Sequence, residues 1–215
     1  MSKYKLVVFD MDGTLLRDRG IFVIAKKLGF YEKLLEMFNY KGIDFYQKSI
    51  EIATLSKGFS VEEYLEIFRK VPYSNNAEKV VRELKNNNIK TAIATDSYQL
   101  LADDVKERLE MDYALANNLI TNDGIITGEL ELHNKELRED FCSGRIYSIC
   151  KSCVLEQLCD DLNISTDEVI AVGDGIVDIG MIKKAGLGIA YRAPEKVQEH
   201  ADIITDDLSV ILEYI

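Results

Sequence analysis

The chain has 215 residues, of which 47% are hydrophobic and 29% are charged, proportions that are ordinary for a folded protein. Its 37 acidic and 26 basic residues give a net charge of −11, which argues against a nucleic-acid partner because such a partner needs a basic patch. No apolar run approaches the roughly 18–20 residues of a membrane span, so we expect no membrane partner. These features predict a cytoplasmic protein whose four cysteines are thiols, and they leave its oligomeric state open.

The first strand-like run is followed at once by a pair of acids. Four apolar residues, 6–9, predict a buried central strand. Asp10 follows at the carboxyl end of that strand, where open α/β sheets place their ligands. Asp12 lies one residue further on, and Gly13 permits a sharp turn behind it. Two carboxylates this close repel each other, and a bound cation would hold both ionised.

Residues 18–73 contain no strand-like alternation and predict helices instead. The expected helices span 21–28, 31–38, 45–55 and a segment that opens after Ser60. Glycines follow the first three, and Ser60 with Glu63 forms the capping box of the fourth. We therefore predict an inserted, all-helical region directly after the acidic pair.

After residue 73 the pattern alternates between helices and strands. The expected elements are helix 78–88, strand 90–95, helix 99–109, a hairpin at 122–124, helix 142–163, strand 169–172, a short helix through 184, strands 187–190 and 203–204, and helix 208–214. This order predicts an α/β fold, a Rossmann-like, mostly parallel sheet flanked by helices. The core would comprise residues 1–17 and 74–215, with 18–73 as a small helical cap.

Two later strand ends also carry chemically capable side chains. Thr95 ends one predicted strand, and Asp174 ends another between two glycines. Asp178 lies one helical turn beyond Asp174 and can face the same side. Because parallel strands end at one edge of the sheet, these groups can converge with Asp10. An oxygen-rich site made of Asp10, the backbone of Asp12 and Asp174 suits Mg²⁺.

Lys151 and the cysteines around it allow alternative interpretations. A lysine on a helix usually faces water, but its neighbours here are apolar or small, so it could project from a partly buried turn. Cys142, Cys150, Cys153 and Cys159 could form a structural zinc site. A helix turns about 100° per residue, which separates Cys159 from Cys150 around the cylinder. Buried apolar cysteines are therefore the preferred interpretation, and zinc is the alternative.

Four motifs together resemble those of the haloacid dehalogenase superfamily. They are Asp10-Met11-Asp12-Gly13-Thr14, Thr95, Lys151 and Gly173-Asp174-Gly175-Ile176-Val177-Asp178. Their order, the helical insert and the Asp-Gly hairpin are similar to the phosphoserine phosphatase subfamily. The run 181–187 after the fourth motif is also similar to that group. The resemblance covers nearly the whole chain.

The resemblance implies a Mg²⁺-dependent phosphatase that hydrolyses a small phosphorylated metabolite through an aspartyl-phosphate. It implies catalytic roles for Asp10, Asp12, Thr95 and Lys151. It implies substrate-binding roles for Gly13, Thr14, Arg19, Asp96 and Ser97. It implies metal binding by Asp10, Asp12, Asp174 and Asp178. Asp10 would be the nucleophile and Asp12 the general acid and base, while the helical insert would close over the substrate.

The sequence departs from the subfamily at positions that face the substrate. Asp96 and Ser97 stand where two glycines are usual, and Val177 replaces an asparagine. Arg19 stands where a glutamate reads the serine ammonium, and Ile52 falls where an arginine reads the carboxylate. Phosphoserine is therefore one candidate substrate. A cysteine directly before the third-motif lysine, here Cys150, also resembles phosphatases that act on phosphoethanolamine or phosphocholine, which are the alternatives. A non-catalytic phosphoacceptor or regulatory domain is the alternative from a different class.

Overall fold

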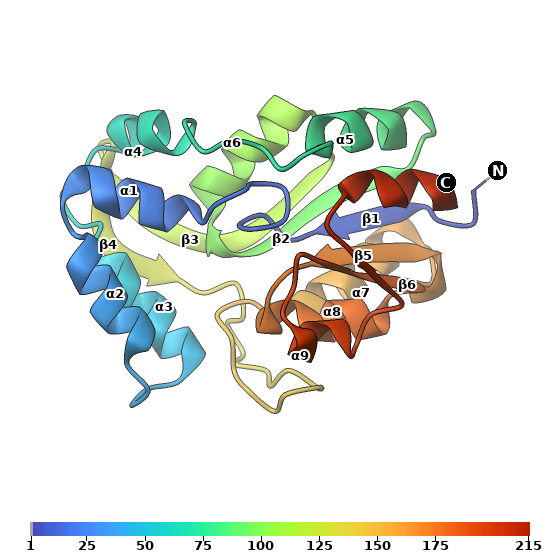
Figure 1. Cartoon of the computed structure of the whole chain (residues 1–215). Helices are drawn as coiled ribbons and strands as arrows, with labels where there is room; N and C mark the ends of the chain where they lie inside the picture. The colour runs from blue at the N-terminus through green and yellow to red at the C-terminus, as the bar shows by residue number, and fades with distance from the viewer. Residues whose placement is uncertain (1) are drawn as a thin grey trace.

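The computed structural model describes residues 2–215, and within them a seven-stranded sheet has the order β4-β3-β2-β1-β5-β6-β7 (Figure 1). The strands are β1 (Leu6–Phe9), β2 (Lys90–Tyr98), β3 (Tyr113–Asn122), β4 (Ile125–Glu131), β5 (Val169–Gly173), β6 (Leu187–Tyr191) and β7 (Ile203–Thr205). All neighbouring pairs are parallel except β3 with β4. The predicted α/β class is therefore confirmed, and β1 lies at the centre of the sheet.

Both faces of the sheet are covered because the central strands are apolar on both sides. In β1, Val7 and Phe9 join one hydrophobic cluster, whereas Leu6 and Val8 join another. The first face is covered by α5 (Ala77–Asn86), α6 (Gln99–Leu109) and the 3₁₀ helix η3 (Leu208–Tyr214). The second is covered by α7 (Lys151–Leu162) and α8 (Ile179–Lys184). The remaining short helices are η1 (Thr166–Glu168), η2 (Ile176–Asp178) and α9 (Glu195–Gln198).

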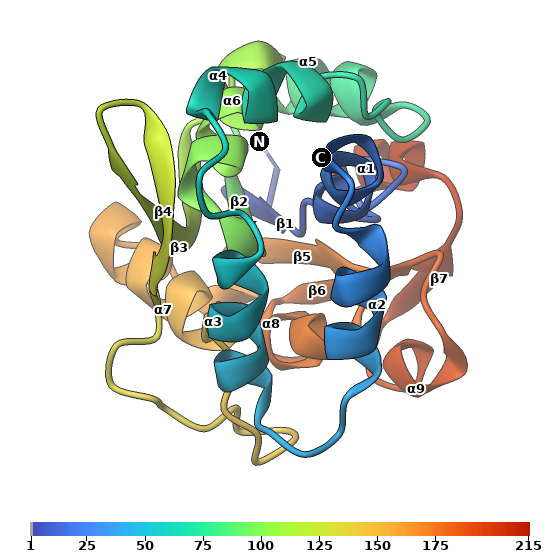
Figure 2. The same ribbon diagram turned by 90° about the vertical axis from the view of Figure 1, so that its left-hand side faces the viewer.

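Four helices fill the segment predicted to be all-helical, and they lie beyond the carboxyl ends of the strands (Figures 1 and 2). They are α1 (Gly20–Leu28), α2 (Tyr31–Asn39), α3 (Phe45–Thr54) and α4 (Val61–Phe68). Gly29 ends α1 with a φ of 82°, and Ser60 caps α4 by accepting a hydrogen bond from the Glu63 amide at 3.1 Å. The division of the chain into core and cap at 18–73 stays a prediction.

The β3–β4 hairpin, predicted from Asn122-Asp123-Gly124, supports the helical segment. The Gly58 amide donates to the Ile126 carbonyl at 2.8 Å, and the Ile126 amide donates to the Phe59 carbonyl at 2.9 Å. These bonds attach the linker between α3 and α4 to the edge strand β4. These bonds pair backbone groups on the open edge of β4, and they also anchor the helices to the hairpin.

The predicted helix 142–163 is wrong in its first half, because α7 begins only at Lys151. The Asp140 carboxylate accepts hydrogen bonds from the amides of Cys142 and Ser143, which gives this segment a local alternative to helical bonding. Gly144 then takes a φ of 63° and reverses the chain. Residues 132–150 form an irregular loop below the sheet in Figure 1.

Two further expectations need smaller corrections. Strand β2 continues beyond Thr95 to Tyr98, because its last residue pairs with β3 after the pairing with β1 has ended. The C-terminal helix 208–214 is a 3₁₀ helix. None of the helices in the described residues 2–215 is both long enough and apolar enough to cross a bilayer.

The expectation that all four cysteines are thiols is also wrong. Cys150 and Cys153 form a disulfide that brackets Lys151 at the start of α7. Cys142 and Cys159 are free, and Cys159 is buried in the hydrophobic cluster beneath the sheet. Two of the four thiols are therefore unavailable for a shared zinc ion.

Candidate active site

A small cavity of about 80 Å³ opens at the carboxyl edge of the sheet, between the strand ends and the helices α1–α3. We call it the inner chamber. It is lined by Asp10, Asp12, Arg19, Ile21, Phe38, Ser49, Ile52, Asp96, Ser97, Tyr98, Asp174, Gly175, Val177 and Asp178. Most of the site residues predicted from the sequence therefore converge on one cavity.

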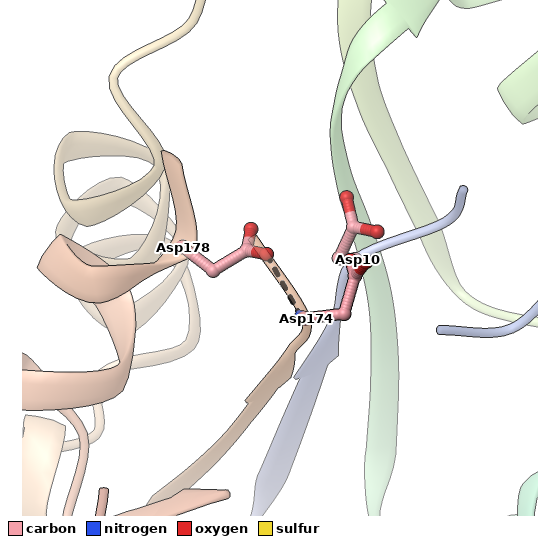
Figure 3. A group of neighbouring side chains, drawn as sticks. All are labelled: Asp10, Asp174 and Asp178. Carbon is pink, nitrogen blue, oxygen red and sulfur yellow. Dashed lines mark hydrogen bonds between the residues drawn. The ribbon is translucent and has the colours of Figure 1, made fainter. Parts of the chain in front are cut away.

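Three carboxylates meet at the floor of the inner chamber (Figure 3). One oxygen from each of Asp10, Asp174 and Asp178 lies within 4.8 Å of the others. The Asp10 amide donates to the Val172 carbonyl of β5 at 2.9 Å, which sets Asp10 at the junction of the two strands. One oxygen of Asp178 accepts hydrogen bonds from the amides of Asp174 at 3.0 Å and Gly175 at 2.8 Å. In Figure 3 Asp178 reaches this group from the opposite side to Asp10.

Lys151 lies beneath these carboxylates at the first position of α7. Its ammonium contacts Asp10 and Asp178 at 2.5 Å each, and its side chain is fully buried. Burial opposes the charged form, but the two carboxylates outweigh it and raise the pKa of Lys151 well above its usual value. Lys151 is thus a buried, permanent cation and does not face water.

The carboxylates themselves are hard to ionise together. Burial raises the pKa of Asp10 well above its usual value, and the Lys151 ammonium opposes that effect. Burial, followed by repulsion from Asp178, raises the pKa of Asp174 to about 6. The one ammonium contacts only two of the three carboxylates, so the group would carry excess negative charge if all three were ionised.

The Asp12 side chain contacts the helical segment. It accepts a hydrogen bond from the amide of Gly20, the first residue of α1, at 2.7 Å. Burial raises the pKa of Asp12 to about 6, and the Gly20 amide opposes this. The carboxylate of Asp12 is not one of the three that gather at the floor, and the expected metal contact of Asp12 through its backbone stays a prediction.

Gly13 is required by the geometry of the first motif. Its φ of 98° lies in the left-handed region, and a Cβ atom there would lie 2.5 Å from an oxygen of Asp174. The turn that brings β1 into the inner chamber therefore passes directly against the carboxylate group. Any side chain at this position would displace Asp174.

Two predicted residues are buried beside the chamber without lining it. Thr95 is fully buried, and its hydroxyl accepts a hydrogen bond from the Ser97 amide at 3.2 Å. The Thr14 hydroxyl is also buried, and within residues 2–215 it has no hydrogen-bond partner. Both hydroxyls retain a proton that they could donate.

Arg19 is the cation at the rim of the inner chamber. Its guanidinium lies 5.8 Å from the ring centre of Phe38. Burial lowers the pKa of Arg19, but the field of Asp96, then Asp174, outweighs this and raises it. No carboxylate among residues 2–215 lies close enough to Arg19 for a direct ion pair.

Sequence reasoning missed several lining residues. Phe38 and Ser49 come from α2 and α3, where the helical pattern identified buried faces without indicating which side chains reach the cavity. Tyr98 continues β2 beyond the predicted strand end. Ile52 and Val177, noted only as departures from a family pattern, do line the chamber.

The group of three carboxylates is also the place where side chains could share a metal ion. Among residues 2–215, Asp10, Asp174 and Asp178 are the only set of three His, Cys, Asp or Glu side chains placed to share an ion. The alternative of a zinc site on the cysteines is therefore not supported.

Comparisons with known proteins agree with this geometry. Residues 7–183 match the family model of the haloacid dehalogenase-like hydrolases. The chain is 34% identical to the phosphoserine phosphatase of Methanocaldococcus jannaschii, over 100% of this chain and 99% of that protein. It is 31% identical to the phosphoserine phosphatase of Campylobacter jejuni, over 98% of this chain and 99% of that protein.

Solved structures give the same result. A substrate-bound phosphoserine phosphatase complex superposes with a TM-score of 0.84 at 32% identity, covering 100% of both chains. A phospho-aspartyl intermediate analogue of phosphoserine phosphatase superposes with a TM-score of 0.82 at 32% identity, covering 99% of both chains. The resemblance stated from the motifs is confirmed, and the chain belongs to the haloacid dehalogenase-like hydrolases.

Proposed function

We propose that this protein is a Mg²⁺-dependent phosphatase that hydrolyses a small phosphomonoester through an aspartyl-phosphate on Asp10. The observation that carries this proposal is the group of three carboxylates at the floor of the inner chamber, with the buried ammonium of Lys151 against Asp10 and Asp178. A carboxylate in such a position can carry a phosphoryl group, and phosphoryl transfer depends on positioned charge.

The residues present fit Mg²⁺. Carboxylate oxygens are the donors this ion prefers, and it commonly takes only one or two of them while keeping several waters. Asp10 and Asp174 would hold the ion, while Asp178 keeps its bonds to the amides of Asp174 and Gly175. When bound, the ion would neutralise charge on the transferring phosphoryl group.

Two residues would carry out the chemistry in two steps. The Asp10 carboxylate attacks phosphorus and the bond to the leaving alcohol breaks, while Asp12 gives that alcohol its proton. Water then attacks the aspartyl-phosphate and gives its proton to Asp12, which releases phosphate and restores Asp10. The Gly20 amide would hold Asp12 in place for both proton transfers.

The neighbouring groups would hold the phosphoryl oxygens. Thr95 accepts from the Ser97 amide, which leaves its hydroxyl proton free to donate to the phosphate. Lys151 supplies a fixed positive charge. Gly13 allows the close approach of the first loop, and the Thr14 hydroxyl remains available behind it.

The helical segment 18–73 would act as the cap that closes the site. Its first helix holds Asp12 through Gly20, and its second and third helices contribute Phe38, Ser49 and Ile52 to the chamber. Closure would exclude bulk water from the aspartyl-phosphate and protect it from the wrong acceptor.

The substrate would be a small phosphorylated metabolite. The relatives above are named phosphoserine phosphatases, which makes phosphoserine the first candidate here. Phosphoethanolamine and phosphocholine are the alternatives that the sequence left open, although the Arg19 guanidinium that lines the chamber would repel their cationic groups. Action in the cytoplasm stays a prediction, and the disulfide contradicts the thiol state that was expected from it.

The test is phosphate release from p-nitrophenyl phosphate and from a panel of phosphorylated metabolites, with added Mg²⁺ and with EDTA. We expect turnover that requires Mg²⁺. No release from any ester in the presence of Mg²⁺ would favour the phosphoacceptor alternative, and equal release with EDTA would contradict the metal assignment.

A further inference from the structure

A second cavity adjoins the inner chamber on the side of α3 and the loop 132–150. We call it the outer chamber, and its volume is about 250 Å³, against about 80 Å³ for the inner one. The residues common to both are Arg19, Phe38, Ser49, Ile52, Asp96, Gly175 and Val177. The two cavities therefore adjoin along these residues, and the outer one is not lined by the three carboxylates.

Two walls of the outer chamber, α3 and the loop 132–150, contact each other directly. Phe45 of α3 packs on Tyr147 of the loop with ring centres 5.1 Å apart, and the Arg145 guanidinium lies 5.0 Å from the Phe45 ring centre. The Tyr46 amide also donates to the Ile146 carbonyl at 3.3 Å. These contacts join the helical segment to the loop and close one side of the chamber.

The lining of the outer chamber is mostly apolar, with cations at its edges. Beyond the shared residues it is formed by Phe45, Lys48, Tyr147, Ser148 and Ile176. Lys48 donates one of its three ammonium hydrogens to the Phe38 carbonyl at 2.8 Å, which holds its ammonium beside α2. Arg19, at the junction of the two chambers, makes no ion pair within residues 2–215 and is free to receive an anion.

We propose that the two chambers together select a phosphomonoester with a bulkier leaving group than serine, one that carries a carboxylate for Arg19 and an apolar portion of ring size for the outer chamber. This rests on the proposed phosphatase function, because it assumes that the phosphate lies beside Asp10. An ammonium group at the Arg19 position would be repelled by the guanidinium. Phe45, Ile52 and Tyr147 would contact the apolar portion.

The competing explanation is that Arg19 only offsets the charge of Asp96 or touches the phosphate itself. Either role would affect every phosphomonoester to the same degree. A role in reading the leaving group would affect only esters that carry the carboxylate. The two explanations can therefore be separated by comparing substrates within one variant.

The experiment uses three esters with the same primary alkyl leaving oxygen. They are N-benzoyl-O-phosphoserine, its carboxamide analogue and N-acetyl-O-phosphoserine. For the wild type we expect kcat/KM for the benzoyl ester to exceed that for its carboxamide by at least about 10-fold, from the charged hydrogen bond to Arg19. We expect it to exceed that for the acetyl ester by about 10-fold, from burial of the ring.

Two variants assign these preferences to the residues. Arg19→Gln should abolish the preference for carboxylate over carboxamide, and Phe45→Ala should abolish the preference for benzoyl over acetyl. The matched controls are Arg82→Gln on α5 and Tyr40→Ala at the end of α2, which are exposed side chains outside both chambers. Both controls should keep the wild-type ratios.

The outcomes separate this inference from the function on which it rests. Turnover of p-nitrophenyl phosphate without any preference among the three esters would overturn the inference and leave the phosphatase function standing. A loss in Arg19→Gln that is equal for all three esters would also overturn it. No turnover of any ester, with Mg²⁺ present, would overturn both.

Discussion

The inner and outer chambers adjoin, but they are built in opposite ways. The inner chamber is acidic, and its reactive groups stand at or just beyond the ends of β1, β2 and β5, with a lysine at the start of α7. The outer chamber is mostly apolar and is formed by α3 and an irregular loop that are about a hundred residues apart in the chain. This difference indicates that the strand ends carry the catalytic groups, whereas α3 and the loop 132–150 select the substrate.

The largest effect should come from the nucleophile of the inner chamber. Asp10→Asn should abolish turnover, because an amide cannot attack phosphorus and the change also removes a ligand for the metal. Steady-state phosphate release is the measurement, with Asp206→Asn at an exposed position as the matched control. Near wild-type release by Asp10→Asn would show that water attacks directly or that another acid is the nucleophile.

Asp12→Asn should have the next largest effect and should leave substrate binding intact. The amide can keep the bond to the Gly20 amide only through its carbonyl oxygen, and it cannot transfer a proton. Loss of general acid–base catalysis should lower kcat by roughly 10²–10⁴-fold. A kcat within about twofold of wild type would remove Asp12 from the proton transfers.

Lys151→Met should affect stability as well as rate. The substitution removes the ammonium that contacts both Asp10 and Asp178, and breaking a buried ion pair typically costs roughly 3–5 kcal/mol. Urea unfolding should show this loss, and added Mg²⁺ should restore part of it. Lys27→Met, at an exposed position of α1, is the control. An unchanged urea midpoint for Lys151→Met would mean that the buried carboxylates do not need Lys151 for the stability of the fold.

The smallest effect should come from a helix cap that lies outside both chambers. Ser60→Ala removes the hydroxyl that accepts from the Glu63 amide at the start of α4. The free energy of unfolding should fall by roughly 1 kcal/mol, which is typical for loss of a helix cap. Urea unfolding measures this free energy. A changed ratio of kcat/KM between the benzoyl and acetyl esters would contradict the expectation that this cap affects stability and not the choice of substrate.

The parts of the molecule that the sequence predicted well are those where a local pattern decides the structure. The apolar run 6–9 forms the buried strand that its composition predicts. Gly13 lies at a turn that a side chain would block. Ser60 and Gly29 mark helix ends through local hydrogen bonding and backbone geometry. These signals depend on a few neighbouring residues, so they can be recognised without knowing the fold.

The parts it predicted poorly depend on distant contacts. The loop 132–150 looked helical at its end because its apolar residues have helical spacing, but Asp140 binds the amides that a helix would need. Tyr147 and Phe45 meet only after the chain has folded. The outer chamber could not be foreseen, because its walls come from α3 and this loop and no motif links them.

The most direct test of the central claim is to trap the phosphorylated enzyme. A ³²P-labelled phosphate ester is mixed with the wild-type protein and Mg²⁺, the reaction is quenched in acid within one turnover, and the labelled peptide is sequenced. The account predicts label on Asp10, none in Asp10→Asn, and a longer-lived label in Asp12→Asn because water then lacks its base. Label on another residue, or full turnover in the wild type with no label, would contradict it.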